Sequence, residues 1–184
     1  GNIFQRGVRD SGAIMVGSAC PPSGTYGPHR SRWQYSNFGS RLDVQGQGRE
    51  VCTTGTGDLW NGGPNRKYAG DFKNTSSASP QIVGAALCIQ GMCKARGRAV
   101  LSPTAMRDLL VGTGSAQVDG NYGPASQHIG PQPDLQRAYL KLFPVFCPAP
   151  FVCPAGPICP AAPIRRCPPA VLVLECKPSP RVLK

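Results

Sequence analysis

Residues 72–89 read F-K-N-T-S-S-A-S-P-Q-I-V-G-A-A-L-C-I, a cluster of small polar residues followed at once by a long apolar run. The apolar residues recur on every side of the expected helix axis, which is typical of a buried helix and not of an amphipathic one. Pro80 suits the first turn of such a helix, where its missing N–H does no harm. The hydroxyls before it lie near free backbone N–H groups, either as helix caps or as a nucleophile.

The strands predicted around this helix are short. The continuous apolar run at 12–19, G-A-I-M-V-G-S-A, predicts a strand buried on both faces. Two more strands are expected at 42–44 and 49–54, on either side of a Gly-rich turn at 46–48. Residues 55–71, rich in Gly and Asn, are expected to form a loop.

Two further helices are announced by their first residues. Ser102 followed by Pro103 predicts an N-cap and a first helical residue, with the helix ending near Gly112. A weaker helix is expected to begin around Pro133-Asp134 and to carry Leu135, Ala138, Tyr139 and Leu142. Strands and helices in this mixture predict an α/β fold for residues 1–142.

The composition changes after Phe143, where Cys-Pro-Ala-x-Pro-apolar copies form an approximate six-residue repeat. Proline at this density excludes helix and central strand, so residues 143–184 are expected to form an irregular Pro/Cys-rich tail. The chain has 9 cysteines, most of them in this tail. That distribution favours an oxidising compartment, and therefore disulfides and a secreted or cell-envelope location.

The formal net charge is +11 and the pI is about 9.6. The basic residues are scattered, with no dense run, so we expect no nucleic-acid partner and keep an anionic cell surface as a candidate partner. No metal framework and no cofactor motif is present in the sequence. The N-terminus has no signal peptide and no apolar stretch of about 20 residues occurs, so we expect a mature fragment or a truncated chain.

The stretch N-T-S-S-A-S-P at 74–80 resembles the nucleophile signature of subtilisin-like serine proteases, usually Gly-Thr-Ser-x-Ala-x-Pro at the head of a buried helix. Four flanking stretches resemble the family in the right order: A-I-M-V-G at 13–17, S-N-F-G with L-D-V between 36 and 44, V-C-T-T at 51–54, and L-S-P through T-G between 101 and 114. The resemblance covers about residues 8–142. It implies the C-terminal portion of a subtilisin-like catalytic domain.

On this resemblance Ser76 is the nucleophile and Thr75 lies beside the oxyanion site. A serine at a helix start has a free backbone N–H that can donate to an oxyanion, and the helix dipole favours the same charge. Asn74 replaces the family's glycine, whose freedom to adopt positive φ only asparagine approaches. The alternative is that these hydroxyls only cap the helix.

The usual partners of the serine are missing from the sequence. The family's H-G-T-x-x-A-G helix is absent, and the two histidines, His29 and His128, are expected at the surface. Asp10 lies in a D-S-G motif, and Asp10, His29 and Ser76 follow the family's order. Too few residues separate them to build the intervening strands and helices, so this compact triad is the weaker interpretation.

The sequence therefore predicts a serine endopeptidase that cleaves polypeptide substrates through an acyl-enzyme on Ser76. The N-terminal part of the protease domain would supply the triad Asp and His, so the chain alone is expected to be inactive. An exposed apolar face is expected where that part packs. The alternative is a non-catalytic secreted binding or cell-envelope module built on a partial protease scaffold.

Overall fold

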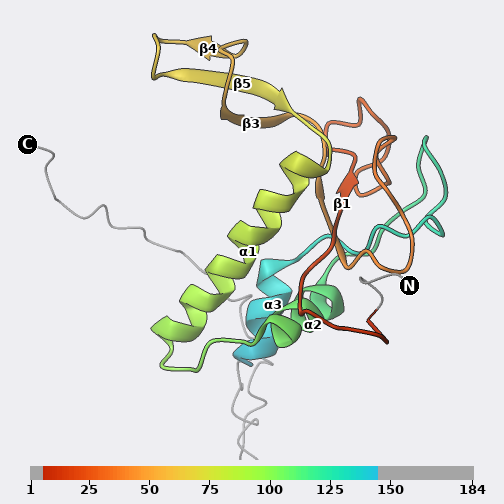
Figure 1. Ribbon diagram of the computed structural model, residues 1–184, viewed down its shortest axis with the longest axis vertical. Coiled ribbons are helices and arrows are strands. Elements are labelled where there is room, and N and C mark those ends of the chain that lie inside the picture. The colour runs from red at the N-terminus through yellow and green to blue at the C-terminus, as the bar shows by residue number, and fades with distance from the viewer. Residues whose placement is uncertain (1–5, 145–184) are drawn as a thin grey trace, which may run out of the picture. The chain divides into compact units, whose positions relative to one another are not determined.

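The computed structural model describes residues 6–144 (Figure 1). Within this range the helices and strands are β1 (Val16–Ala19), β2 (Val44–Gln47), β3 (Val51–Thr54), β4 (Trp60–Asn61), β5 (Lys67–Phe72), α1 (Thr75–Ala95), α2 (Pro103–Thr113) and α3 (Leu135–Leu142). β1 and β2 pair in parallel, and β3, β5 and β4 form an antiparallel sheet in that order. The mixed α/β class expected from the sequence is confirmed for these residues.

α1 packs against both strands of the parallel pair, and Val44 of β2 is fully buried beneath it. The turn predicted at 46–48 is wrong, because Gly46 lies inside β2. A Cβ at Gly46 would come within 2.6 Å of the Ala78 carbonyl oxygen on α1. The glycine is thus needed where strand and helix backbones touch, which the sequence alone does not distinguish from a turn.

The loop predicted at 55–71 is also wrong, since β4 and most of β5 lie within it. The antiparallel sheet adjoins the N-terminal end of α1, because β5 ends two residues before the Asn74 cap (Figure 1). Its side chains are half-buried or exposed, including the neighbouring rings of Trp60 and Tyr68, whose centroids lie 5.9 Å apart. A strand without a buried face lacks the alternation that sequence patterns detect.

α1 begins at Thr75, so Pro80 lies inside the helix and not at its start. The expectation that this helix is buried all round is wrong on one side. Ile82 and Ile89 are buried, whereas Val83 is 58% and Leu87 66% exposed. The apolar core that α1 does cover consists of Val44, Ile82, Ile89, Cys93, Met106, Leu109, Leu110 and Ala138.

The cap expected at Ser102 is confirmed, and Asp134 caps α3 in the same way. The Ser102 hydroxyl accepts a hydrogen bond from the Ala105 N–H at 3.2 Å, and the Asp134 carboxylate accepts one from the Arg137 N–H at 2.9 Å. No helix within residues 6–144 is long and apolar enough to cross a membrane. The expected Pro/Cys-rich tail lies outside the described residues, apart from its first two residues.

The four cysteines within the described residues are free thiols, so the disulfides expected from the cysteine count are not found there. They are Cys20, Cys52, Cys88 and Cys93, of which the first and last are buried.

Candidate active site

The turn that leads from β5 into α1 is held in an unusual backbone conformation. Asn74, the N-cap residue, has φ 66° and ψ −164°, a region that is occupied almost only by glycine. Its N–H donates to the Gly48 carbonyl at 2.8 Å, and its own carbonyl accepts from the Ser77 N–H at 3.1 Å. The chain is thus pinned on both sides of the strained residue.

The hydroxyls that follow Asn74 lie in different surroundings. Ser77 is fully buried, and its hydroxyl donates to the Gln47 carbonyl at 3.0 Å and to the Asn74 carbonyl at 2.8 Å. The Ser79 hydroxyl donates to the carbonyl of the half-buried Thr75 at 3.0 Å. Ser76 is exposed, and neither its hydroxyl nor its N–H has a hydrogen-bond partner among the described residues. Of these serines, Ser76 is thus the one free to react.

Gln81 fastens the start of α1 to the end of β2. Its side-chain oxygen accepts from the Gln47 N–H at 3.1 Å, and its amide group donates to the carbonyls of Gln47 at 2.9 Å and Ser77 at 2.8 Å. These bonds fix the first turns of α1, which carry the exposed serine, against the end of β2. Sequence reasoning missed this glutamine, because a polar residue near a helix start has no distinctive signal.

Trp33 contacts the cap residue from a distant part of the sequence. Its indole N–H donates to the Asn74 side-chain oxygen at 3.0 Å, and the residue is only 3% exposed. Tyr26 and Tyr122 meet the indole edge-on, with ring centroids 5.3 and 5.1 Å away. The Arg49 guanidinium lies over the same ring at 5.1 Å. This cluster also escaped the sequence analysis.

Asp10 is engaged elsewhere. Its carboxylate forms a bidentate ion pair with the buried Arg107 of α2, at 2.8 and 2.5 Å, and accepts from the Gly12 N–H at 2.9 Å. The Arg107 hydrogen bonds, followed by that of Gly12, hold the pKa of Asp10 well below its usual range.

The two histidines lie apart from this carboxylate. His29 is half-buried, and burial followed by the charge of Arg30 lowers its pKa. His128 is exposed, with a ring nitrogen 3.1 Å from the Leu42 carbonyl oxygen. Within residues 6–144 no hydrogen bond links Asp10, His29 and Ser76, and no cluster of three or more metal-ligating side chains occurs.

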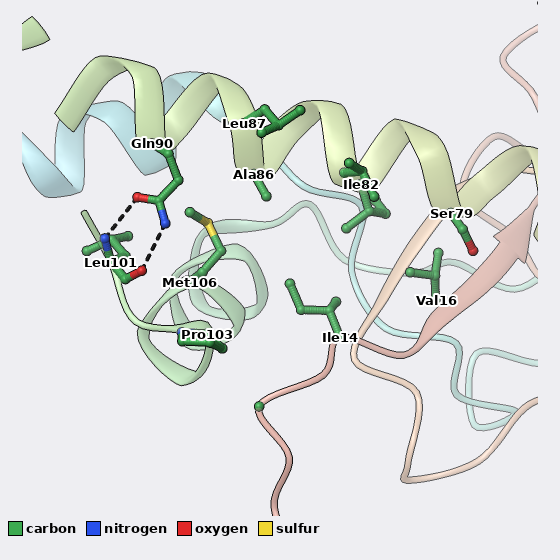
Figure 2. Close-up of a pocket in the computed structure, with 12 residues that line it drawn as sticks. Ile14, Val16, Ser79, Ile82, Ala86, Leu87, Gln90, Leu101, Pro103 and Met106 are labelled. Carbon is green, nitrogen blue, oxygen red and sulfur yellow. Dashed lines mark hydrogen bonds between the residues drawn. The ribbon is translucent and has the colours of Figure 1, made fainter. Parts of the chain in front are cut away.

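An apolar groove of about 450 Å³ runs beside α1, with Ser79 among the residues that line it (Figure 2). Ile14, which precedes β1, and Met106 of α2 point into it. The Gln90 side chain closes one end by bonding both the N–H and the carbonyl of Leu101 at 2.9 Å. Leu87 stands at its rim, so the groove continues the exposed face of α1.

No family model and no curated protein sequence matches the chain. Solved structures that are similar to the chain do exist. The patellamide maturation protease PatA is similar with a TM-score of 0.55 and 18% identity over 72% of this chain, and the self-cleaved protease domain of PatA with 0.52, 18% and 72%. The prenylagaramide maturation protease PagA is similar with 0.50, 17% and 68%.

These three neighbours are subtilisin-like proteases, so the comparison supports a subtilisin-like fold for the described part of the chain. The chain spans 43%, 42% and 41% of their lengths, less than half in each case.

Proposed function

We propose that this chain carries the nucleophile of a subtilisin-type serine endopeptidase, with Ser76 as the residue that forms the acyl-enzyme. The observation that carries the proposal is the contrast between neighbouring hydroxyls. Ser77 is buried and bound twice to backbone carbonyls, while Ser76 is exposed and unengaged in the first turn of α1. The hydroxyl of a residue that only capped the helix would accept a hydrogen bond from a backbone N–H.

The chemistry follows from this position. The Ser76 oxygen attacks the carbonyl carbon of the scissile peptide bond while its proton passes to a general base. The resulting oxyanion lies where the free Ser76 N–H and the positive end of the α1 dipole can stabilise it. Collapse of this intermediate expels the amine with the transferred proton, and water then hydrolyses the ester.

The general base and its carboxylate come from a further protease segment that is not among residues 6–144. Asp10 is committed to Arg107, and neither histidine bonds to it or to Ser76 within the described range. We propose that the partner segment packs on the apolar groove and on the open face of α1. Within residues 6–144 the parallel sheet has two strands, fewer than the roughly four to six that are usual for a sheet, which also favours further strands.

The test is covalent labelling of the full chain with a fluorophosphonate, read by intact mass and peptide mapping. Ser76→Ala and Ser77→Ala are the matched controls. We expect little adduct on the chain alone, since loss of the triad base costs several orders of magnitude in rate. Adduct on Ser76 is expected after addition of an upstream in-frame segment that contains an H-G-T-x-x-A-G helix.

The outcomes separate the alternatives. Stoichiometric labelling of Ser76 without any addition would mean that a base is present in the chain, and Asp10 and His29 would have to be reconsidered. Failure to label Ser76 even with the upstream segment, or the absence of such a segment from the reading frame, would favour a non-catalytic binding module that uses the basic surface.

A further inference from the structure

The N-cap of α1 has an unused capping group. Asparagine is among the best N-cap residues because its side-chain oxygen accepts from the N–H of the second or third helical residue. Those residues are Ser76 and Ser77 here, since α1 begins at Thr75. Asn74 makes no such bond, although its side chain is of the right kind.

Trp33 binds the group that would form the cap. The Asn74 side-chain oxygen that would cap the helix accepts instead from the indole N–H of Trp33, at 3.0 Å. The indole cannot easily move, because Tyr26, Tyr122 and Arg49 surround it and it is almost fully buried. The tryptophan therefore holds the asparagine oxygen away from the first turn of the helix.

Arg49 is itself fixed, which makes the arrangement rigid. Its guanidinium bonds both carboxylate oxygens of Asp71, at 2.9 and 2.7 Å, and the Tyr26 hydroxyl at 2.7 Å. Asp71 belongs to β5, the strand that leads into Asn74. The contacts of Arg49 thus link β5, the strand before the turn, to Trp33, which binds Asn74 in the turn.

We propose that Trp33 is a positioning residue that prevents Asn74 from capping α1 and so keeps the Ser76 N–H free for an oxyanion. The role of that N–H in catalysis rests on the function proposed above, but the anti-capping contact does not. With glycine at position 74 no side chain could compete for the Ser76 N–H. Trp33 is thus required only because asparagine occupies this position.

The experiment is amide hydrogen exchange of the full chain followed by NMR, with four proteins: wild type, Trp33→Phe, Asn74→Gly and the double variant. Phenylalanine keeps an aromatic ring but removes the N–H. In Trp33→Phe the freed Asn74 oxygen turns onto the helix, and exchange at the Ser76 amide slows about fivefold, as expected for one cap bond. In the double variant the exchange returns to the rate of Asn74→Gly.

A purely structural role for Trp33 predicts the opposite sign. Loosening of the turn would make the Ser76 and Ser77 amides exchange faster after Trp33→Phe, whether asparagine or glycine occupies position 74, and that result would overturn the proposal. Trp60→Phe is the matched control, because Trp60 is 50% exposed and lies on β4. It should leave both amides unchanged.

Repeating the exchange in a Ser76→Ala background separates this inference from the proposed function, because the measurement reports the backbone and not the hydroxyl. In an enzyme completed with the upstream segment, Trp33→Phe should lower kcat about 100-fold with little change in KM, as for loss of one oxyanion donor. In the same enzyme, adding Asn74→Gly to Trp33→Phe should restore kcat. Unchanged exchange in Trp33→Phe would overturn the inference even if Ser76 is labelled.

Discussion

One face of α1 rests on β1 and β2, and the opposite face carries Val83 and Leu87 into solvent. Both faces carry large apolar side chains, so the exposure of Val83 and Leu87 reflects what covers each face. The face that carries the fully buried Ile89 is covered by other described residues. The face of Leu87 has no such cover among them, which is why it borders the groove in Figure 2. Under the proposed function, this exposed apolar surface is where the partner segment would pack.

Ile89→Ala tests the covered face and should have the largest effect. The side chain is fully buried in the core, so its truncation leaves a cavity and should lower the free energy of unfolding by about 2–5 kcal/mol. Equilibrium unfolding in urea measures this. A loss of less than about 1 kcal/mol would mean that the core collapses around the cavity or is loosely packed.

Gly46→Ala tests the contact between this face and β2. The added methyl group would overlap the backbone of Ala78, so we expect a loss of about 1–3 kcal/mol in the same urea experiment. Gly84→Ala is the matched control, since a Cβ there meets no atom within 4 Å. That variant should be neutral or stabilising by up to about 1 kcal/mol, because alanine favours the helix.

The ion pair between Asp10 and Arg107 should give a smaller, pH-dependent effect beside the open face. Gly12 and Pro103, which line the groove, lie close to these two residues in the sequence. Because folding lowers the pKa of Asp10, its contribution is present above the ordinary carboxyl pKa and disappears as the pH falls. Between about pH 5 and pH 2, the urea midpoint of wild type should therefore fall more than that of Asp10→Asn.

Parallel loss of stability in wild type and Asp10→Asn over this range would contradict the assignment. It would mean that other carboxylates, such as Asp43 with its arginine partners, dominate the acid response.

Leu87→Gln tests the open face and should have the smallest effect on the chain alone. A side chain that is 66% exposed loses little when it becomes polar, so the free energy of unfolding should change by no more than about 0.5 kcal/mol. The same variant should weaken labelling of Ser76 in the presence of the upstream segment. A large loss of stability in the isolated chain would show instead that Leu87 already has a partner.

The sequence predicted those elements that are marked by local start signals or by a run of apolar residues. Ser102 caps its helix as expected, and α3 begins near Asp134 as expected, because a helix start depends only on neighbouring residues. β1 was expected at 12–19 from its apolar run and occupies Val16–Ala19. The subtilisin-like fold was predicted from motifs in order, and the structural neighbours support it.

Contacts between distant residues could not be predicted in this way. The bond from Trp33 to Asn74 and the ion pair of Asp10 with Arg107 each join residues more than 40 positions apart. Nothing in the local pattern marks either one, because the partners become neighbours only after the chain has folded. β4 and β5 were missed for another reason, since strands whose side chains are only half-buried or exposed lack a buried face.

The close approach of Gly46 to Ala78 has a consequence for mutational tolerance. Two backbones, and not two side chains, set the spacing between β2 and the first turns of α1. Core side chains farther along the helix can therefore drift in size during divergence at a cost in stability alone. Contacts of the main chain set the position of the exposed serine. The candidate site can therefore persist when many of the core side chains that support it are replaced.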